Sequence, residues 1–176
     1  MASIRLWTFQ RELVAEFLSQ NSSYHASWDW TPSNWRKAYR WMAKCLQERT
    51  REVSNAAPVW CWHSCNGQPG GPPTVWTARA LLSDYDFEQG VVMLTLSVPE
   101  ELTLASSYWV WNGFLDYVIV HRALPRSRRW RRRMLQAPLF KHDTDDVQAV
   151  IPFIRTEWIE NIAKVIIAGR NDDEHL

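Results

Sequence analysis

The sequence has few glycines and few cysteines, and each shortage excludes a class of protein. None of the six glycines has the spacing of a Walker or dinucleotide-binding loop with a helix after it. The three cysteines, Cys45, Cys61 and Cys65, are odd in number, which argues against a disulfide framework. Cys61 and Cys65 flank His63, but no second Cys/His pair follows at a suitable distance, so we expect no metal site.

The sequence also lacks a long apolar run and a strong net charge. No stretch approaches the ~20 apolar residues that cross a bilayer, and the first residues run directly into a strand-like segment instead of a signal peptide. We therefore expect a cytoplasmic protein that contacts no membrane. The formal net charge is +1, so no global electrostatic field attracts nucleic acid.

Tryptophan is the abundant residue, with 12 copies among 176 residues. In the segment Pro58–Ser64, a period of two places Trp60 and Trp62 on one face of a strand and His63 on the other. The only Gly/Pro-rich loop, residues 66–73, follows directly. We interpret the segment as the wall of a pocket, with His63 at its mouth as the catalytic candidate. The alternative, which is commoner for a histidine inside a strand, is a hydrogen-bonded core residue.

Helices are concentrated early in the chain, and strands lie mostly in its middle and at its end. The periodicities predict strands at 4–9, 58–64, 91–98, 147–154 and 162–167, helices at 10–20, 31–48 and 108–121, an extended segment at 74–82 and a turn at 83–86. Alternation of strand and helix is absent. The pattern therefore favours one α+β domain over residues 1–170, with a mixed, mostly antiparallel sheet and N-terminal helices, followed by a flexible tail at 171–176.

A basic run at Arg126–Arg133 is the most visible charge feature. Arginines interleaved with Trp130 can contact phosphates and stack on a base. The run therefore predicts contact with a nucleic acid or a protein partner, through Arg128, Arg129, Arg131 and Arg132. The alternative is a solvated helix face with Trp130 and Met134 turned inward and its charge neutralised by the acidic residues at 143–146 and in the tail.

Several short segments, in order along the chain, resemble a mainly bacterial family, the domain-of-unknown-function family numbered 3841. The matching segments are residues 6–10, 39–42, 58–62, 94–104, 109–111, 147–150 and 154–158. Together they span most of the chain. The resemblance implies an uncharacterised bacterial or phage protein, and the family carries no assigned activity.

The order of elements is also similar to that of small ADP-ribosyltransferases. Those enzymes begin with a strand carrying a polar NAD-contacting residue, where Thr8 and Gln10 stand here. They finish with a Gln-Ala-Glu element whose glutamate stabilises the positive charge that develops as nicotinamide leaves. Gln148 and Ala149 match the start of that element, but Val150 stands in place of the glutamate.

The second resemblance implies an ADP-ribosyltransferase-like split sheet with a cleft that binds NAD, with or without transferase activity. It implies NAD contacts from Thr8, Gln10, Trp60, Trp62 and Gln148, with His63 and Glu157 as catalytic candidates. Glu157 is the carboxylate that would replace the missing one. The competing hypothesis is a non-enzymatic interaction protein that acts through the basic run. Convergence of Thr8, His63 and Gln148 on one cleft is what the NAD hypothesis requires.

Overall fold

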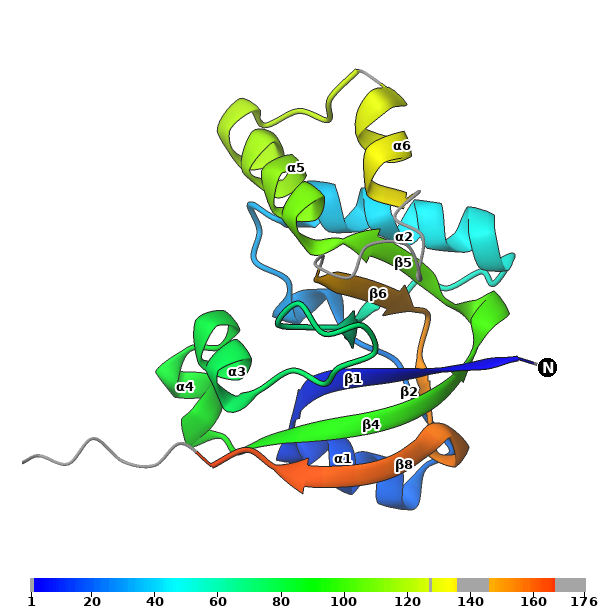
Figure 1. Cartoon of the computed structure of the whole chain (residues 1–176), viewed down its shortest axis with the longest axis vertical. Helices are drawn as coiled ribbons and strands as arrows, with labels where there is room; N and C mark the ends of the chain where they lie inside the picture. The colour runs from blue at the N-terminus through cyan, green and yellow to red at the C-terminus, as the bar shows by residue number, and fades with distance from the viewer. Residues whose placement is uncertain (1, 127, 136–145, 167–176) are drawn as a thin grey trace, which may run out of the picture.

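The fold is built on an antiparallel sheet of six strands in the order β5-β6-β3-β1-β4-β8 (Figure 1). The computed structural model describes residues 2–126, 128–135 and 146–166. The strands are β1 Ser3–Arg11, β3 Val59–Ser64, β4 Val91–Pro99, β5 Leu104–Ser107, β6 Val147–Ile151 and β8 Ile159–Lys164, and a separate pair joins β2 Ser23–Tyr24 to β7 Ile154–Arg155. The predicted α+β class with a mostly antiparallel sheet is confirmed, whereas its mixed character is wrong because every described strand pair is antiparallel.

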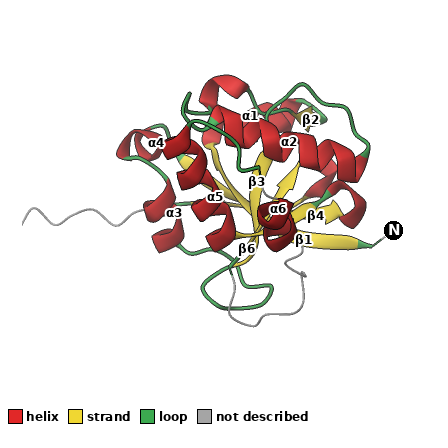
Figure 2. Ribbon diagram, turned by 90° about the horizontal axis from the view of Figure 1, so that it is seen from above, coloured by secondary structure: helices red, strands yellow, loops and turns green. Residues whose placement is uncertain are grey.

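Helices cover both faces of the sheet. They are α1 Glu12–Gln20, α2 Arg36–Thr50, α3 Val75–Leu81, α4 Asp84–Glu88, α5 Tyr108–His121 and α6 Arg128–Leu135, with short 3-10 turns η1 Trp28–Trp30, η2 Glu100–Leu102 and η3 Thr156–Trp158. Seen from above in Figure 2, α2, α5 and α6 lie over the strands. We call these three helices the helical layer. No helix in the described ranges is long and apolar enough to cross a membrane.

The side chains of β3 and β6 alternate between two cores. Cys61 and Ala149 belong to the core that includes residues of α1, and Trp60 and Val150 pack into the core under the helical layer. Because successive side chains of a strand point to opposite faces, these cores lie on opposite sides of the sheet. The predicted separation of Trp60 from Cys61 is confirmed.

Helix capping explains where the prediction of local structure was wrong. Residues 74–82 were expected to be extended, but Thr74 and Thr77 close a capping box at the start of α3. The expected turn at 83–86 is the first turn of α4, where Ser83 and Asp86 form the same motif. Helix α2 begins at Arg36 instead of at 31, and the predicted tail lies outside the described residues.

A narrow junction joins the two halves of the sheet. Nine residue pairs register β1 to β4, but a single pair, Trp7 opposite Trp62, registers β1 to β3. Beside this pair the Thr8 hydroxyl donates to the Trp60 carbonyl at 2.8 Å and accepts from the Gln10 amide at 2.8 Å. The Thr8 side chain therefore supplies a cross-strand hydrogen bond where the strands diverge.

We expect Thr8→Val to lower the free energy of unfolding by about 1–3 kcal/mol, because it leaves the Trp60 carbonyl and the Gln10 amide without their partner. Urea denaturation measures this change. Thr95→Val is the matched control, since the Thr95 hydroxyl makes no hydrogen bond to the described residues and the side chain is half-buried. Equal losses in both variants would contradict a special role for Thr8.

Candidate functional site

The polar residues predicted for an NAD cleft are divided between the two faces of the sheet. Gln148 is registered with Trp62, and Trp62 with Trp7, so all three point to the face under the helical layer. Thr8 follows Trp7 and therefore points to the opposite face, together with Gln10. The structure brings Thr8 to Gln10, and Trp62 to Gln148, but it does not bring the two pairs together.

Both tryptophans of β3 are engaged in aromatic packing. The Trp60 ring lies 4.7 Å from the Trp111 ring of α5 and 5.1 Å from the Tyr39 ring of α2, between centroids. The Trp62 ring lies 5.0 Å from Tyr108 at the start of α5. Such contacts stabilise the helical layer on the sheet.

A cluster of buried polar atoms lies under the helical layer. Trp60 Nε1, Ser106 Oγ and Gln148 Oε1 have no hydrogen-bond partner among the described residues. Ser106 and Gln148 are direct cross-strand neighbours on β5 and β6. Ser106 was not among the residues expected at the site from the sequence.

His63 and Ser64 tie the Gly/Pro-rich loop to the end of β3. The Nδ1 atom of His63 lies 2.8 Å from the Ser64 hydroxyl, which accepts a hydrogen bond from the Gly70 N–H at 2.9 Å. The strand register shifts between Trp62 and Ser64, so His63 sits in an irregularity of the ladder. His63 is buried, and its removal from water lowers its pKa below the ordinary value.

The lowered pKa of His63 predicts a loss of stability in acid. Protonation favours the unfolded chain, so the stabilisation is complete above the unfolded pKa of about 6.5 and is lost as the pH falls below it. We expect the free energy of unfolding to fall more between pH 7.5 and pH 5.5 in the native sequence than in His63→Asn, measured by urea denaturation. Parallel pH profiles would show that His63 does not contribute.

Glu157 is exposed, and Cys61 is buried. Glu157 is exposed on η3, where its carboxylate pairs with Arg155 at 3.2 Å. Burial raises the pKa of the Cys61 thiol, which keeps it protonated and unreactive. No group of three His, Cys, Asp or Glu residues that could hold a metal ion occurs among the residues described.

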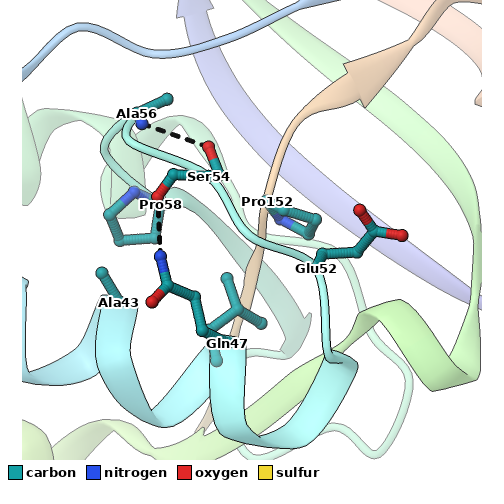
Figure 3. A pocket seen from close by; sticks show the side chains of 8 residues that line it. Ala43, Gln47, Glu52, Ser54, Ala56, Pro58 and Pro152 are labelled. Atoms are coloured by element: carbon teal, nitrogen blue, oxygen red, sulfur yellow. Dashed lines mark hydrogen bonds between the residues drawn. The ribbon is translucent and has the colours of Figure 1, made fainter.

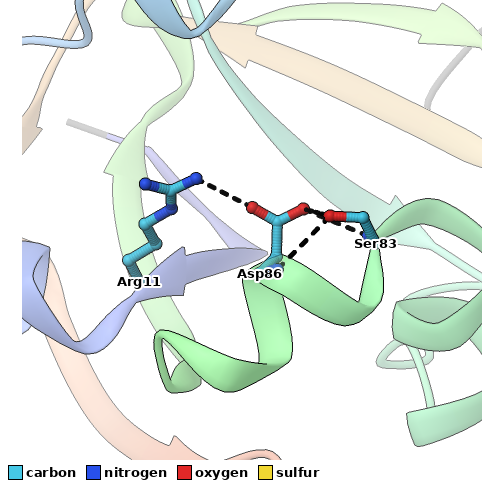
Figure 4. Close-up of polar contacts among 3 residues, drawn as sticks. All are labelled: Arg11, Ser83 and Asp86. Carbon is cyan, nitrogen blue, oxygen red and sulfur yellow. Dashed lines mark hydrogen bonds and ion pairs between the residues drawn. The ribbon is translucent and has the colours of Figure 1, made fainter.

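Arg11 links the end of β1 to Asp86 of α4 (Figure 4), and it also contacts η1. Its guanidinium pairs with the Asp86 carboxylate at 3.0 Å and lies 4.2 Å from the centroid of the Trp30 ring. The Asp86 carboxylate also accepts from the Ser83 hydroxyl at 2.6 Å. Burial alone would raise the pKa of Asp86, but the hydrogen bonds from Ser83 and Arg11 lower it below the ordinary value. The positive charge of Arg11 is therefore paired with α4.

A groove of about 370 Å³ lies along α2 and was not predicted from the sequence. It is lined by Trp28 of η1, Arg40, Lys44 and Gln47 of α2, and Asn55 of the segment that leads to β3. The Trp28 indole N–H donates to the Asn55 carbonyl at 2.7 Å. The spacing of Arg40 and Lys44, four residues apart, indicates that they share a helix face, but only the fold brings Trp28 beside them.

A second, much smaller pocket of about 10 Å³ adjoins the groove and shares Ala43, Gln47 and Ser54 with it (Figure 3). The Gln47 amide donates to the Ser54 carbonyl at 2.6 Å. The Ser54 hydroxyl accepts from the Ala56 N–H at 3.1 Å. A pocket of this size holds about one water molecule, so the groove is the larger binding space of the two.

Helix α6 presents cations outward and apolar side chains inward. Met134 is fully buried, and the Trp130 ring lies 6.2 Å from the Phe114 ring of α5. Arg129, Arg132 and Arg133 are exposed. The alternative interpretation, with Trp130 and Met134 turned inward, is confirmed for these two side chains.

Comparison with known protein families finds a match over most of the chain. A family model with the description "Domain of unknown function (DUF3841)" matches residues 5–155. Neither the search of curated proteins nor the search of solved structures finds a match.

Proposed function

We propose that this member of the DUF3841 family binds nucleic acid through the exposed arginine face of α6. The description of the family names no activity, so the proposal is argued from the structure. The observation that carries this proposal is the division of α6 into an anchored side and a charged side. All five cations of α6 are arginines, and the helix contains no acidic residue. Arginine binds phosphate through two parallel hydrogen bonds, which favours a phosphate-rich partner.

The exposed cations of α6 follow a helical spacing. Arg129, Arg132 and Arg133 are three and four residues apart and therefore project from one side of the helix. Trp130 and Met134, which anchor α6 to the core, are also four residues apart. A partner on the charged side can therefore meet several guanidinium groups while Trp130 and Met134 stay packed against the core.

Helix α2 adds positive charge to the helical layer. It carries five Arg or Lys residues and one acidic residue, Glu48, although the whole chain has a net charge of only +1. The charge is therefore concentrated locally. Exposed clusters of this kind attract phosphates at short range, and the attraction decreases with salt.

We expect a fluorescently labelled single-stranded oligonucleotide to bind at low salt with a negative slope of log K against log salt. The triple variant Arg129→Ala/Arg132→Ala/Arg133→Ala should reduce the size of that slope by about 2, because about 0.7 counterions are released for each phosphate contact to a single strand. Fluorescence anisotropy at several salt concentrations measures both slopes.

The control changes the net charge by the same amount elsewhere. Arg5, Arg79 and Lys164 are exposed residues outside the helical layer, and their replacement by Ala should leave the slope unchanged. Exposed ion pairs contribute about 0–1 kcal/mol, so the control should remain folded. Oligonucleotide binding that is absent, or that both triple variants weaken equally, would refute a role for α6.

The NAD-binding cleft of an ADP-ribosyltransferase-like protein is a second candidate, supported by the polar cluster of Trp60, Ser106 and Gln148. Their unpartnered atoms are groups that a buried ligand would satisfy. The division of Thr8 and Gln148 between opposite faces is the observation against it. Ligand contacts would therefore have to come from the side of the helical layer.

If this cleft binds NAD, millimolar NAD should raise the melting temperature, by about 3–5 °C when its concentration is ~10 times Kd. Gln148→Leu should abolish the increase, because it removes the amide that meets the ligand. Differential scanning calorimetry measures both. An unchanged melting temperature, or an increase that persists in Gln148→Leu, would refute this cleft.

A further inference from the structure

We infer that the groove along α2 is a binding site for a nucleoside phosphate, with Arg40 and Lys44 holding the phosphate and Trp28 contacting the base. The groove lies between α2, η1 and the segment before β3. Its volume of about 370 Å³ falls in the range of small-ligand sites, about 300–1,000 Å³. It is distinct from the NAD cleft considered above, because none of the residues assigned to that cleft lines it.

The positive side chains that line this groove favour binding of an anion. Arg40 and Lys44 are exposed, and neither has an ion-pair partner among the described residues. No acidic side chain lines the groove within the part of the chain that the structure describes. The charge of Arg11, by contrast, is already satisfied by Asp86. Two unpaired cations one helical turn apart form a suitable pair of donors for a phosphate.

An aromatic surface lies next to that charge. The Arg40 guanidinium is 5.8 Å from the centroid of the Trp28 ring. The indole N–H of Trp28 is bonded to the Asn55 carbonyl, which fixes the ring beside α2. Stacking of a base on a tryptophan contributes about 1–3 kcal/mol per base. A simple anion would not use this ring, whereas a nucleotide uses both the ring and the cations.

Gln47 and Ser54 add polar groups to the lining of the groove. The Gln47 amide and the backbone of Ser54 are joined by a hydrogen bond of 2.6 Å. The amide oxygen of Gln47 accepts hydrogen bonds, and a second amide hydrogen remains to be donated. Hydrogen-bonding groups of this kind can contact the ribose hydroxyls or the edge of a base.

Adenosine 5′-monophosphate is the probe, titrated by calorimetry and by NMR of the tryptophan indole N–H signals. The Trp28 signal is assigned as the one that disappears in Trp28→Phe. We expect saturable binding that shifts this signal, and a loss of affinity of about tenfold or more in Arg40→Ala/Lys44→Ala, because charge-assisted hydrogen bonds are lost. The control Arg49→Ala/Arg79→Ala removes the same charge outside the groove and should keep the affinity within about twofold.

The inference would be overturned by the absence of saturable binding, by inorganic phosphate that binds as tightly as the nucleotide, or by equal weakening in the control pair. Titration with a short oligoadenylate tests whether the groove binds a nucleotide within a strand or only a free mononucleotide. It shifts the Trp28 signal if the groove accepts a unit of a strand, and it leaves the signal unchanged if only the free mononucleotide enters.

The inference does not depend on the proposed function of α6. The variant Arg129→Ala/Arg132→Ala/Arg133→Ala should bind adenosine 5′-monophosphate with unchanged affinity, since those residues do not line the groove. Loss of oligonucleotide binding with retained nucleotide binding separates the two sites. Nucleotide binding that falls with the α6 substitutions would overturn the assignment to the groove.

Discussion

The contact between Trp7 and Trp62 is the constraint on which the arrangement of the two halves depends. β1, β4 and β8 form one half of the sheet with α1 against it, and β3, β5 and β6 form the other half under the helical layer. The halves meet at this registered pair, and the Thr8 hydroxyl reinforces the pair from the opposite face. Only one residue pair is registered between β1 and β3, so the Trp7–Trp62 contact and the Thr8 hydrogen bond join these strands. Elsewhere in the sheet, backbone hydrogen bonds join neighbouring strands.

The alternation of side chains between the two faces of the sheet, which forms the two cores, also limits which residues can share a binding site. Residues one position apart along β1 and β3 face different layers, so polar residues that are close in the sequence pattern do not form a common cleft. The centre of the sheet is occupied by packed aromatic rings, among them Trp60 and Trp62. The groove lies instead along α2, and the exposed arginines lie along α6, both in the helical layer.

Strong local patterns were sufficient to predict much of the fold. The strand β3 and the helix α5 follow from periodicity, and the inward direction of Trp130 was one of two interpretations of the basic run. Helix α3 was not predicted because its capping box uses Thr77 where a Glu or Gln is usual. The groove was not predictable for another reason: Trp28 is held beside α2 by its hydrogen bond to Asn55, which is 27 residues away in the sequence.

The anchoring of α6 separates what holds this helix from what it offers to a partner. Trp130 and Met134 pack against the core, whereas Arg129, Arg132 and Arg133 are exposed. Substitutions at exposed positions usually change stability by less than about 0.5 kcal/mol. Exposed residues of α6 can therefore be substituted to bind another class of ligand while Trp130 and Met134 keep the helix in place. This makes the helix a suitable place to engineer new specificity.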